Sequence, residues 1–177
     1  MTPTHKKISK YLSYILRHKP QSIGLKLDAN GWANIDELIA KTTQMELSRQ
    51  DIEIVVENNS KQRFAIDGDK IRANQGHSIE VDLALEPQTP PDILYHGTAT
   101  RFIDSINQNG LLPQSRQHVH LSSDKDTAIE VGKRHGKVVV LEIDCTQMAT
   151  DGYSFYLSHN GVWLTDAVPK EYIINLR

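Results

Sequence analysis

The chain has 177 residues, of which 38% are hydrophobic and 24% charged, and its formal net charge is −2 at neutral pH. These numbers fit one large domain or two small ones. They exclude a protein that binds nucleic acids through a large overall positive charge. No apolar run approaches the roughly 20 residues that cross a bilayer, so no membrane segment is expected.

The charge is unevenly distributed along the chain. The residues before Asp28 include five lysines, one arginine and no acid, whereas residues 81–177 contain 8 basic and 12 acidic side chains. The first part can therefore attract phosphate groups locally, while the second part repels them in general.

Two features bear on where the protein works. The lysines near the N-terminus are followed by no apolar stretch, so we expect no signal peptide. Cys145 is the only cysteine, which excludes an internal disulfide and a zinc cluster built from cysteines. This usage suits the reducing cytoplasm, where we expect the protein to act as a monomer. Because Cys145 follows the apolar run 138–144, a buried structural thiol is favoured over a nucleophile.

Residues 5–18 predict the first helix. Its apolar residues recur with the spacing of one helical face: Ile8, Tyr11, Leu12 and Ile15. The helix must end near Lys19, because Pro20 disfavours helical geometry in the residue before it. Arg17 and His18 then lie in the last turn, where the helix dipole favours cations by about 0.3–1 kcal/mol. The helix dipole alone can explain why Arg17 and His18 occur there. However, two side chains that can carry positive charge, placed where the chain leaves the helix, also suit a functional site.

The next elements complete a module over residues 1–85. A turn at residues 28–31 precedes two helices, which we expect to begin at Asn34 and Ser48, each with an acid three residues later. Two alternating runs around residues 67–69 then predict a hairpin. Three helices followed by a hairpin indicate a winged-helix module. Such modules usually bind nucleic acid, although some serve only as packing scaffolds.

The predicted hairpin is rich in cations, which are Lys61, Arg63, Lys70 and Arg72. Lys61 and Arg63 would share one face of its first strand. Such a face can clamp a phosphate or simply lie in solvent. Residues 74–77 end the module with a loop, and the Pro-rich segment 86–91 predicts a short, semi-rigid linker.

Residues 92–177 predict a second domain, of α+β class and rich in strands. It begins with a short apolar strand that leads into His96 and Gly97, where glycine would let a ligand approach the backbone closely. A helix over residues 100–109 follows and ends at Gly110. Its apolar face would consist of Phe102, Ile103 and Ile106.

The stretch 116–123 predicts a strand with one polar face. Two histidines alternate with two aliphatic residues, in the order His118, Val119, His120 and Leu121. On a strand of period two, both imidazoles point to one side, and Arg116 joins them if the strand extends that far. Such a face is either an exposed edge or the wall of a polar site.

Four further elements are expected after this strand. Ser123 would cap a helix that stops near Gly136, and the hydrophobic run 138–144 would form the central strand. A hairpin is predicted around residues 159–161, and residues 172–177 would form the last strand.

Several functional classes find no support in the sequence. It contains no Rossmann fingerprint, no Walker loop and no serine nucleophile elbow. His118 and His120 could in principle chelate a metal, but no acid or cysteine lies nearby to complete the ligand set. No metal is therefore expected.

Taken together, the motifs resemble a known family. In the second domain these are YHGT at 95–98, RQHVHLSSD at 116–124, VGKRHG at 131–136 and NGVWLT at 160–165, which resemble the ADP-ribosyltransferase fold. In the first they are LRHKP at 16–20, GLKLDANGWANIDELI at 24–39, KQRFAI at 61–66 and IRANQGHSI at 71–79. Over nearly the whole chain, the set resembles the NAD-dependent RNA 2′-phosphotransferases. Each motif alone is weak, but eight in the right order are specific.

The resemblance implies a two-step reaction on RNA that bears an internal 2′-phosphate. First, the phosphate attacks the ribose carbon of NAD that carries nicotinamide, and nicotinamide leaves. Then the neighbouring ribose hydroxyl attacks the phosphorus, and the RNA 2′-oxygen leaves. The products are repaired RNA and ADP-ribose 1″,2″-cyclic phosphate, and the implied process is tRNA splicing or RNA repair.

The resemblance also implies the residues of the site. The catalytic set would be Arg17, His18, Arg63 and Arg116, with Arg134 as the competing candidate for the fourth position. NAD would be held by His96, Gly97, Thr98, His120, Leu121 and Ser122, with Arg134 as a further contact. Val162 stands where many ADP-ribosyltransferases carry glutamate, as it does in this family. The two residue sets would meet in a cleft between the domains.

Two other functions remain as alternatives. An NAD-dependent ADP-ribosyltransferase that modifies nucleic-acid ends or a protein would share the NAD motifs without needing the Arg-His pair. A winged-helix protein that binds nucleic acid without catalysis would consume no NAD.

Overall fold

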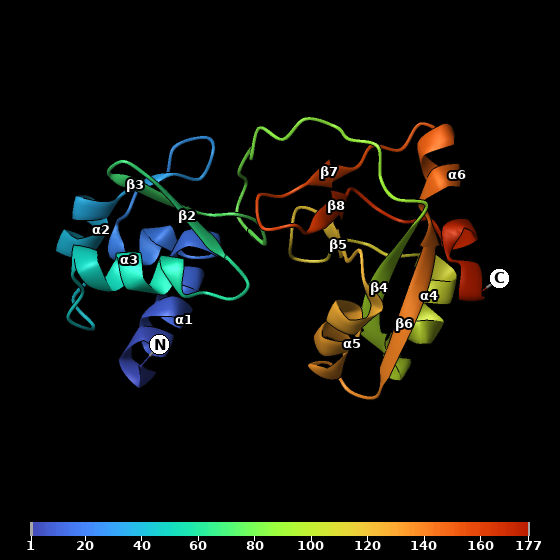
Figure 1. Cartoon of the computed structure of the whole chain (residues 1–177), viewed down its shortest axis with the longest axis horizontal. Helices are drawn as coiled ribbons and strands as arrows, with labels where there is room; N and C mark the ends of the chain where they lie inside the picture. The colour runs from blue at the N-terminus through green and yellow to red at the C-terminus, as the bar shows by residue number, and fades with distance from the viewer. Residues whose placement is uncertain (1, 177) are drawn as a thin grey trace. The chain divides into compact units, whose positions relative to one another are not determined.

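The computed structural model describes residues 2–176, which form a mixed α/β structure with small sheets, as the sequence predicted in outline. The chain divides into two compact units, Met1–Ala84 and Leu85–Arg177 (Figure 1). Each unit has a hydrophobic core of its own. Within residues 2–176, no helix is long and apolar enough to span a membrane.

The three α-helices of the first unit begin at side-chain caps. Their bounds are α1 Pro3–Arg17, α2 Ile35–Lys41 and α3 Arg49–Glu57, and the short 3₁₀ helix η1 covers Pro20–Ile23. Asn34 Oδ1 accepts a hydrogen bond from the N–H of Glu37 at 2.9 Å, and Ser48 Oγ accepts one from the N–H of Asp51 at 3.1 Å. Each cap satisfies an amide that a helix leaves without a partner, so the two predicted helix starts are confirmed.

The sheet of the first unit is small and antiparallel. Its strands are β1 Ala33–Asn34, β2 Phe64–Asp67 and β3 Lys70–Ala73, in the order β1-β3-β2. The predicted hairpin around residues 67–69 is confirmed. The expectation that Lys61 and Arg63 share a strand face is wrong, because β2 begins only at Phe64 and Gln62 has a φ of 44°. These two cations therefore belong to the turn between α3 and β2.

The core of the first unit explains why α1 carries one apolar stripe. Ile8, Leu12 and Ile15 are almost completely buried and pack with the apolar faces of α2, α3 and β3. Burial of such side chains supplies the main driving force for folding, at about 1.5–3 kcal/mol each. It fixes α1 against the sheet, so the end of α1 has a defined position.

The second unit is built around two long antiparallel strands, β4 Ile93–Ala99 and β6 Val138–Asp144. The expectation that residues 138–144 form a central strand is wrong, because within residues 2–176 the sheet of β6 contains β4 alone. Along β6, the side chain of Asn175 accepts a hydrogen bond from the N–H of Glu142 at 3.0 Å and donates one to the carbonyl of Val140 at 2.9 Å. An amide side chain thus pairs with backbone groups much as a neighbouring strand would.

Helix α5, Lys125–Lys133, packs directly on β4 and β6, as Figure 1 shows. Its cap is Asp124 and not Ser123, because the Asp124 carboxylate accepts hydrogen bonds from the N–H and the hydroxyl of Thr127 at 2.8 and 2.9 Å. The closeness of the packing depends on Gly97. A Cβ at that position would lie only 2.6 Å from the carbonyl carbon of Ala128. The missing side chain of Gly97 therefore makes room for helix α5. The expectation that Gly97 also lets a ligand approach the backbone stays a prediction.

The remaining elements are a second, three-stranded sheet and several short helices. Their bounds are β5 Val119–Leu121, β7 Tyr156–Leu157, β8 Trp163–Thr165, η2 Thr100–Phe102, α4 Ile103–Asn109, α6 Cys145–Thr150, η3 Lys170–Tyr172 and η4 Ile174–Leu176. The sheet order is β5-β8-β7, and the predicted hairpin around residues 159–161 is confirmed. Gly110 ends α4 as expected, with a φ of 70°, but Phe102 is exposed and does not join its buried face.

The predicted last strand is wrong. Apart from Arg177, which lies outside the described residues, its residues form the 3₁₀ helices η3 and η4 with a single bridge from Ile173 to Ile143. Cys145 is fully buried at the start of α6, as expected for a structural thiol. Burial raises the pKa of this thiol to about 12, so it does not ionise at neutral pH.

Candidate active site

Arg17 and His18 lie where α1 ends. The backbone N–H of His18 donates to the carbonyl of Tyr14 at 3.1 Å and closes the last turn. The side chain of Arg17 is largely buried, and its Nη1 donates to the hydroxyl of Ser13 at 3.2 Å. A guanidinium is costly to bury, so a cation held this way is unlike the solvated ones that usually complement a helix dipole.

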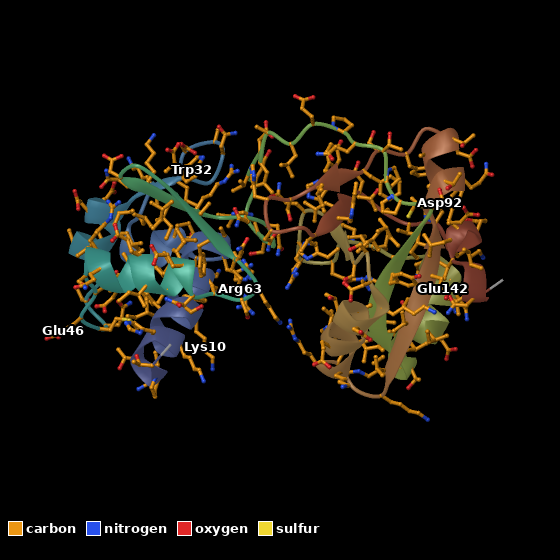
Figure 2. The ribbon with its side chains drawn as sticks, viewed as in Figure 1. Lys10, Trp32, Glu46, Arg63, Asp92 and Glu142 are labelled. Atoms are coloured by element: carbon orange, nitrogen blue, oxygen red, sulfur yellow. The ribbon has the colours of Figure 1, made fainter. Side chains whose placement is uncertain are left out.

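The backbone of Arg63 is held in place by a buried asparagine that follows the C-cap of α3. Asn59 is 4% exposed, and its Oδ1 accepts hydrogen bonds from the backbone N–H groups of Lys61 and Arg63 at 3.1 and 3.5 Å. The carbonyl of Arg63 then accepts one from the N–H of Asn74 at 2.8 Å. Figure 2 labels Arg63, where the chain enters β2. Arg63 is therefore tied to the segment that follows β3.

That segment, residues 74–78, also holds the end of α1. The N–H of Ser78 donates to the carbonyl of Arg17 at 3.0 Å, and the hydroxyl of Ser78 forms a hydrogen bond with Nδ1 of His18 at 2.8 Å. Gly76 lies against the Arg17 guanidinium, since a Cβ on it would be 3.2 Å from Nε and 3.3 Å from Cζ. One short segment thus joins Arg17, His18 and Arg63.

Most of this segment is buried although its side chains are polar. Asn74, Gln75 and His77 are 4%, 8% and 2% exposed, and Arg72 on β3 is 6% exposed with its guanidinium over the ring of Trp32, which Figure 2 labels. The sequence predicts residues 74–77 only as the loop that ends the module, and the burial of these side chains is not predicted. Hydropathy could not reveal their burial, and their only signal was the motif IRANQGHSI.

His77 is a buried titratable group beside these cations. Burial lowers its pKa to about 4, and the nearby positive charges of Arg17, Arg72 and His18 contribute in the same direction. His77 is therefore neutral at pH 7. A neutral imidazole adds no charge to a region that already contains two buried guanidinium groups.

In the second unit, two of the recognised motifs lie side by side. Tyr95 and Ser122 exchange two backbone hydrogen bonds, each 2.8 Å long, which join β4 to the end of β5. Nδ1 of His96 then donates to the carbonyl of His120 at 2.9 Å. That bond requires the proton on Nδ1, and burial lowers the pKa of His96, so its Nε2 is an unprotonated acceptor at neutral pH.

His120 has the opposite tautomer. Arg116 donates from Nη1 to Nδ1 of His120 at 2.9 Å, and an arginine can only donate. Neutral His120 therefore carries its proton on Nε2. Arg116 does not belong to the strand, which begins at Val119, but its side chain still reaches the histidine. The predicted alternation is confirmed, since Val119 and Leu121 are buried while the two histidines are partly exposed.

His118 differs from its neighbour. Its Nε2 lies 3.8 Å from a carboxylate oxygen of Asp166, and its ring packs against Tyr156 at 5.9 Å between centroids. Among residues 2–176, no group of three or more histidines, cysteines and acids is placed to bind a metal. His118 therefore has structural contacts and no sign of a chemical role.

Comparison with known proteins assigns the chain to a family. The family model described as "RNA 2'-phosphotransferase, Tpt1 / KptA family" matches residues 3–167. The chain belongs to the RNA 2′-phosphotransferase family. It is 58% identical over 175 residues to a "Probable RNA 2'-phosphotransferase" of Acaryochloris marina. That alignment covers 97% of each chain. The chain is 57% identical to a protein of the same name from Pseudomonas fluorescens, over 93% of each chain, and 54% identical to one from Flavobacterium johnsoniae, over 95% of this chain and 94% of that relative.

Membership in the RNA 2′-phosphotransferase family confirms the resemblance found in the motifs and identifies the protein as a transferase. The residues expected for NAD binding differ in how far their side chains are exposed to a ligand. Leu121 is 1% and Thr98 6% exposed, and Leu121 belongs to the hydrophobic core. Ser122 is partly exposed beside Tyr95, whereas Arg134 is exposed at the C-terminal cap of α5. Leu121 could therefore contact a ligand only through its backbone.

Proposed function

We propose that this protein removes an internal 2′-phosphate from RNA by transferring it to NAD. In the first step, a phosphate oxygen bonds to the ribose carbon that carries nicotinamide, and the bond to nicotinamide breaks. In the second step, the adjacent ribose hydroxyl bonds to the phosphorus, and the bond to the RNA 2′-oxygen breaks. RNA with a free 2′-hydroxyl, nicotinamide and ADP-ribose 1″,2″-cyclic phosphate are released.

The observation that carries this proposal is the arrangement of residues 74–78. This segment contacts the backbone of Arg63 and Arg17 and the ring of His18, three residues that come from distant parts of the sequence. Two arginines and a histidine whose positions depend on one segment suit a phosphate ester, because arginines can bind phosphate oxygens with two parallel hydrogen bonds. The family match over almost the whole chain gives the reaction class.

Within this proposal, the first unit is a winged-helix lobe that binds RNA. Its three helices, its β2–β3 hairpin and the cations near its N-terminus support that role. The second unit is an ADP-ribosyltransferase-like domain that binds NAD. Its paired motifs on β4 and β5 support that role, and residues 86–91 link the two units.

The chemistry assigned to the first unit needs no strong base in the first step. A 2′-phosphate is already ionised at pH 7, so Arg17 and Arg63 need only position it. In the second step, the arginines stabilise negative charge on the non-bridging oxygens of phosphorus. His18 exchanges a proton with the attacking ribose hydroxyl or the departing RNA 2′-oxygen, since histidine titrates near neutral pH.

The residues of the second unit fit NAD as a co-substrate. The unprotonated Nε2 of His96 can accept a hydrogen bond from a ribose hydroxyl. The backbone of Ser122 pairs with that of Tyr95, the residue before His96. Between the two candidate arginines, the contact of Arg116 with His120 supports Arg116 as the fourth catalytic residue. Arg134 then serves as an outer contact to NAD.

The proposal is tested with an RNA that carries one labelled internal 2′-phosphate. Incubation with NAD should move the label into ADP-ribose 1″,2″-cyclic phosphate, and no label should move without NAD. Stable ADP-ribosylated RNA with no cyclic phosphate would instead identify an ADP-ribosyltransferase. Unchanged NAD and RNA would leave only a nucleic-acid binder.

A further inference from the structure

One residue of the segment 74–78 has no role of its own in the scheme so far. The stretch Asn74–Gln75–Gly76–His77–Ser78 is buried from its first residue to His77, and only Ser78 is exposed. That exposed serine makes the two contacts that reach the catalytic pair, one through its backbone to Arg17 and one through its hydroxyl to His18. A surface serine that makes two such contacts is placed to do more than fill a turn.

We propose that Ser78 is a positioning residue that orients the imidazole of His18 for proton transfer in the second step, while Gly76 makes room for the guanidinium of Arg17. The inference rests on the proposed function, because it assigns a role relative to His18. It does not make Ser78 a catalytic residue, since the serine acts through the histidine.

The local geometry shows why His18 needs such a partner. The residue lies at the end of α1 with φ −128° and ψ −44°, outside the regular helix, so the helix itself does not fix its ring. The short bond between Nδ1 and the Ser78 hydroxyl, 2.8 Å, restrains both the ring and the side chain that carries it. The backbone bond from Ser78 to Arg17 anchors the serine to the same helix end.

The chemistry of a hydroxyl also suits a group that gains and loses a proton. A serine oxygen can accept a hydrogen bond from Nδ1–H both in the imidazolium and in the neutral Nδ1–H tautomer. The ring can therefore keep its orientation while Nε2 exchanges its proton with a reacting oxygen. A carboxylate at the same place would stabilise the charged imidazolium and hold the proton more tightly.

Gly76 has a matching effect on the arginine. Its φ of 88° lies in the region that side chains rarely adopt, and the space of a Cβ is limited by the Arg17 guanidinium at 3.2 Å. Any other residue at this position would therefore strain the backbone and press on the side chain of Arg17. Its substitution would disturb folding as well as function, so the test uses Ser78.

The test compares Ser78→Ala with Ser78→Thr, which keeps the hydroxyl, and with Ser22→Ala as a control at another exposed serine of the same unit. Under single-turnover conditions, Ser78→Ala should slow the second step on the order of tenfold or more, so that ADP-ribosylated RNA accumulates, while the first step changes little. Its pH–rate profile for the second step should shift, and Ser78→Thr should restore most of the rate. The free energy of unfolding should stay within about 0.5 kcal/mol in all three.

Two further measurements separate possible failures. In a His18→Ala background, Ser78→Ala should cause no additional loss, because the serine acts only through the imidazole. In the protein without substrate, the nitrogen chemical shifts of the His18 ring should show that Ser78→Ala changes the balance of its tautomers, a result that does not depend on activity. An unchanged tautomer balance, a normal second step or a further loss in the double variant would overturn the inference. Failure of the wild-type protein to release cyclic phosphate would overturn the proposed function instead.

Discussion

Replacement of Gly97 by alanine should strongly destabilise the second unit. The new Cβ would lie 2.6 Å from the carbonyl carbon of Ala128 and 2.9 Å from the amide nitrogen of Gly132. These residues are four apart in α5, so the methyl group would press on two groups that an α-helix joins by a hydrogen bond. Backbone atoms cannot rotate away as a side chain can, and α5 would have to move off β4. Overpacking of this kind costs about 1–3 kcal/mol and sometimes more.

The magnitude should be visible in thermal unfolding. For a unit of this size, a loss of about 3 kcal/mol lowers the Tm on the order of 10–20 °C. Gly132→Ala provides a matched second test. Alanine in a helix is normally better than glycine by about 1 kcal/mol, yet here its Cβ would lie 2.8 Å from the carbonyl oxygen of Thr98, so this variant should also be less stable. The exposed variant Thr100→Ala should unfold like the wild type.

The reasoning would be refuted by a Gly97→Ala protein that unfolds at the wild-type temperature. If that variant also showed a higher KM for NAD, Gly97 would serve the approach of a ligand, as the sequence alone suggested. A lower Tm with an unchanged KM at a permissive temperature would show that the glycine serves the packing of α5.

Three further predictions concern the site. The pKa of His77 is about 4 in the folded state, against an ordinary value of 6.5, so the unfolded chain takes up a proton first as the pH falls. The free energy of unfolding should therefore decline by about 3 kcal/mol between pH 6.5 and 4. Urea titrations of His77→Gln should show a shallower decline. Arg63→Ala or His18→Ala should impair the second step more than the first and accumulate ADP-ribosylated RNA in a gel assay, and equal loss of both steps would contradict their assignment. His96→Ala should raise the KM for NAD roughly tenfold by removal of one hydrogen-bond acceptor, and steady-state kinetics with an unchanged KM would count against its role.

The local features of this fold were readable from the sequence. Asn34 and Ser48 cap their helices as expected, because a cap joins residues only three positions apart. The hairpin around residues 67–69 and the alternation around His120 were equally accessible, since strand periodicity is a property of neighbouring residues. One error also has a local cause. Asp124, one residue after the expected cap, simply offers a better acceptor to Thr127.

Other features depend on residues far apart in the chain, and no local pattern predicts them. The last segment looked like a strand, but its contact with β6 is made largely by the side chain of Asn175. Arg116 reaches His120 although it lies outside the strand, and residues 74–77 are buried although their sequence is typical of a polar loop.

The sequence by itself determined the family, because the order and identity of eight motifs do not depend on how the chain folds. It also determined the helix starts and hairpins, whose hydrogen bonds form within a few residues. Only the tertiary structure decided that Ser78 bonds to His18, that Asn59 holds Arg63 and that Gly97 admits α5. These contacts arise when apolar side chains from distant segments are buried together, and that burial fixes the backbone positions from which the polar side chains reach each other.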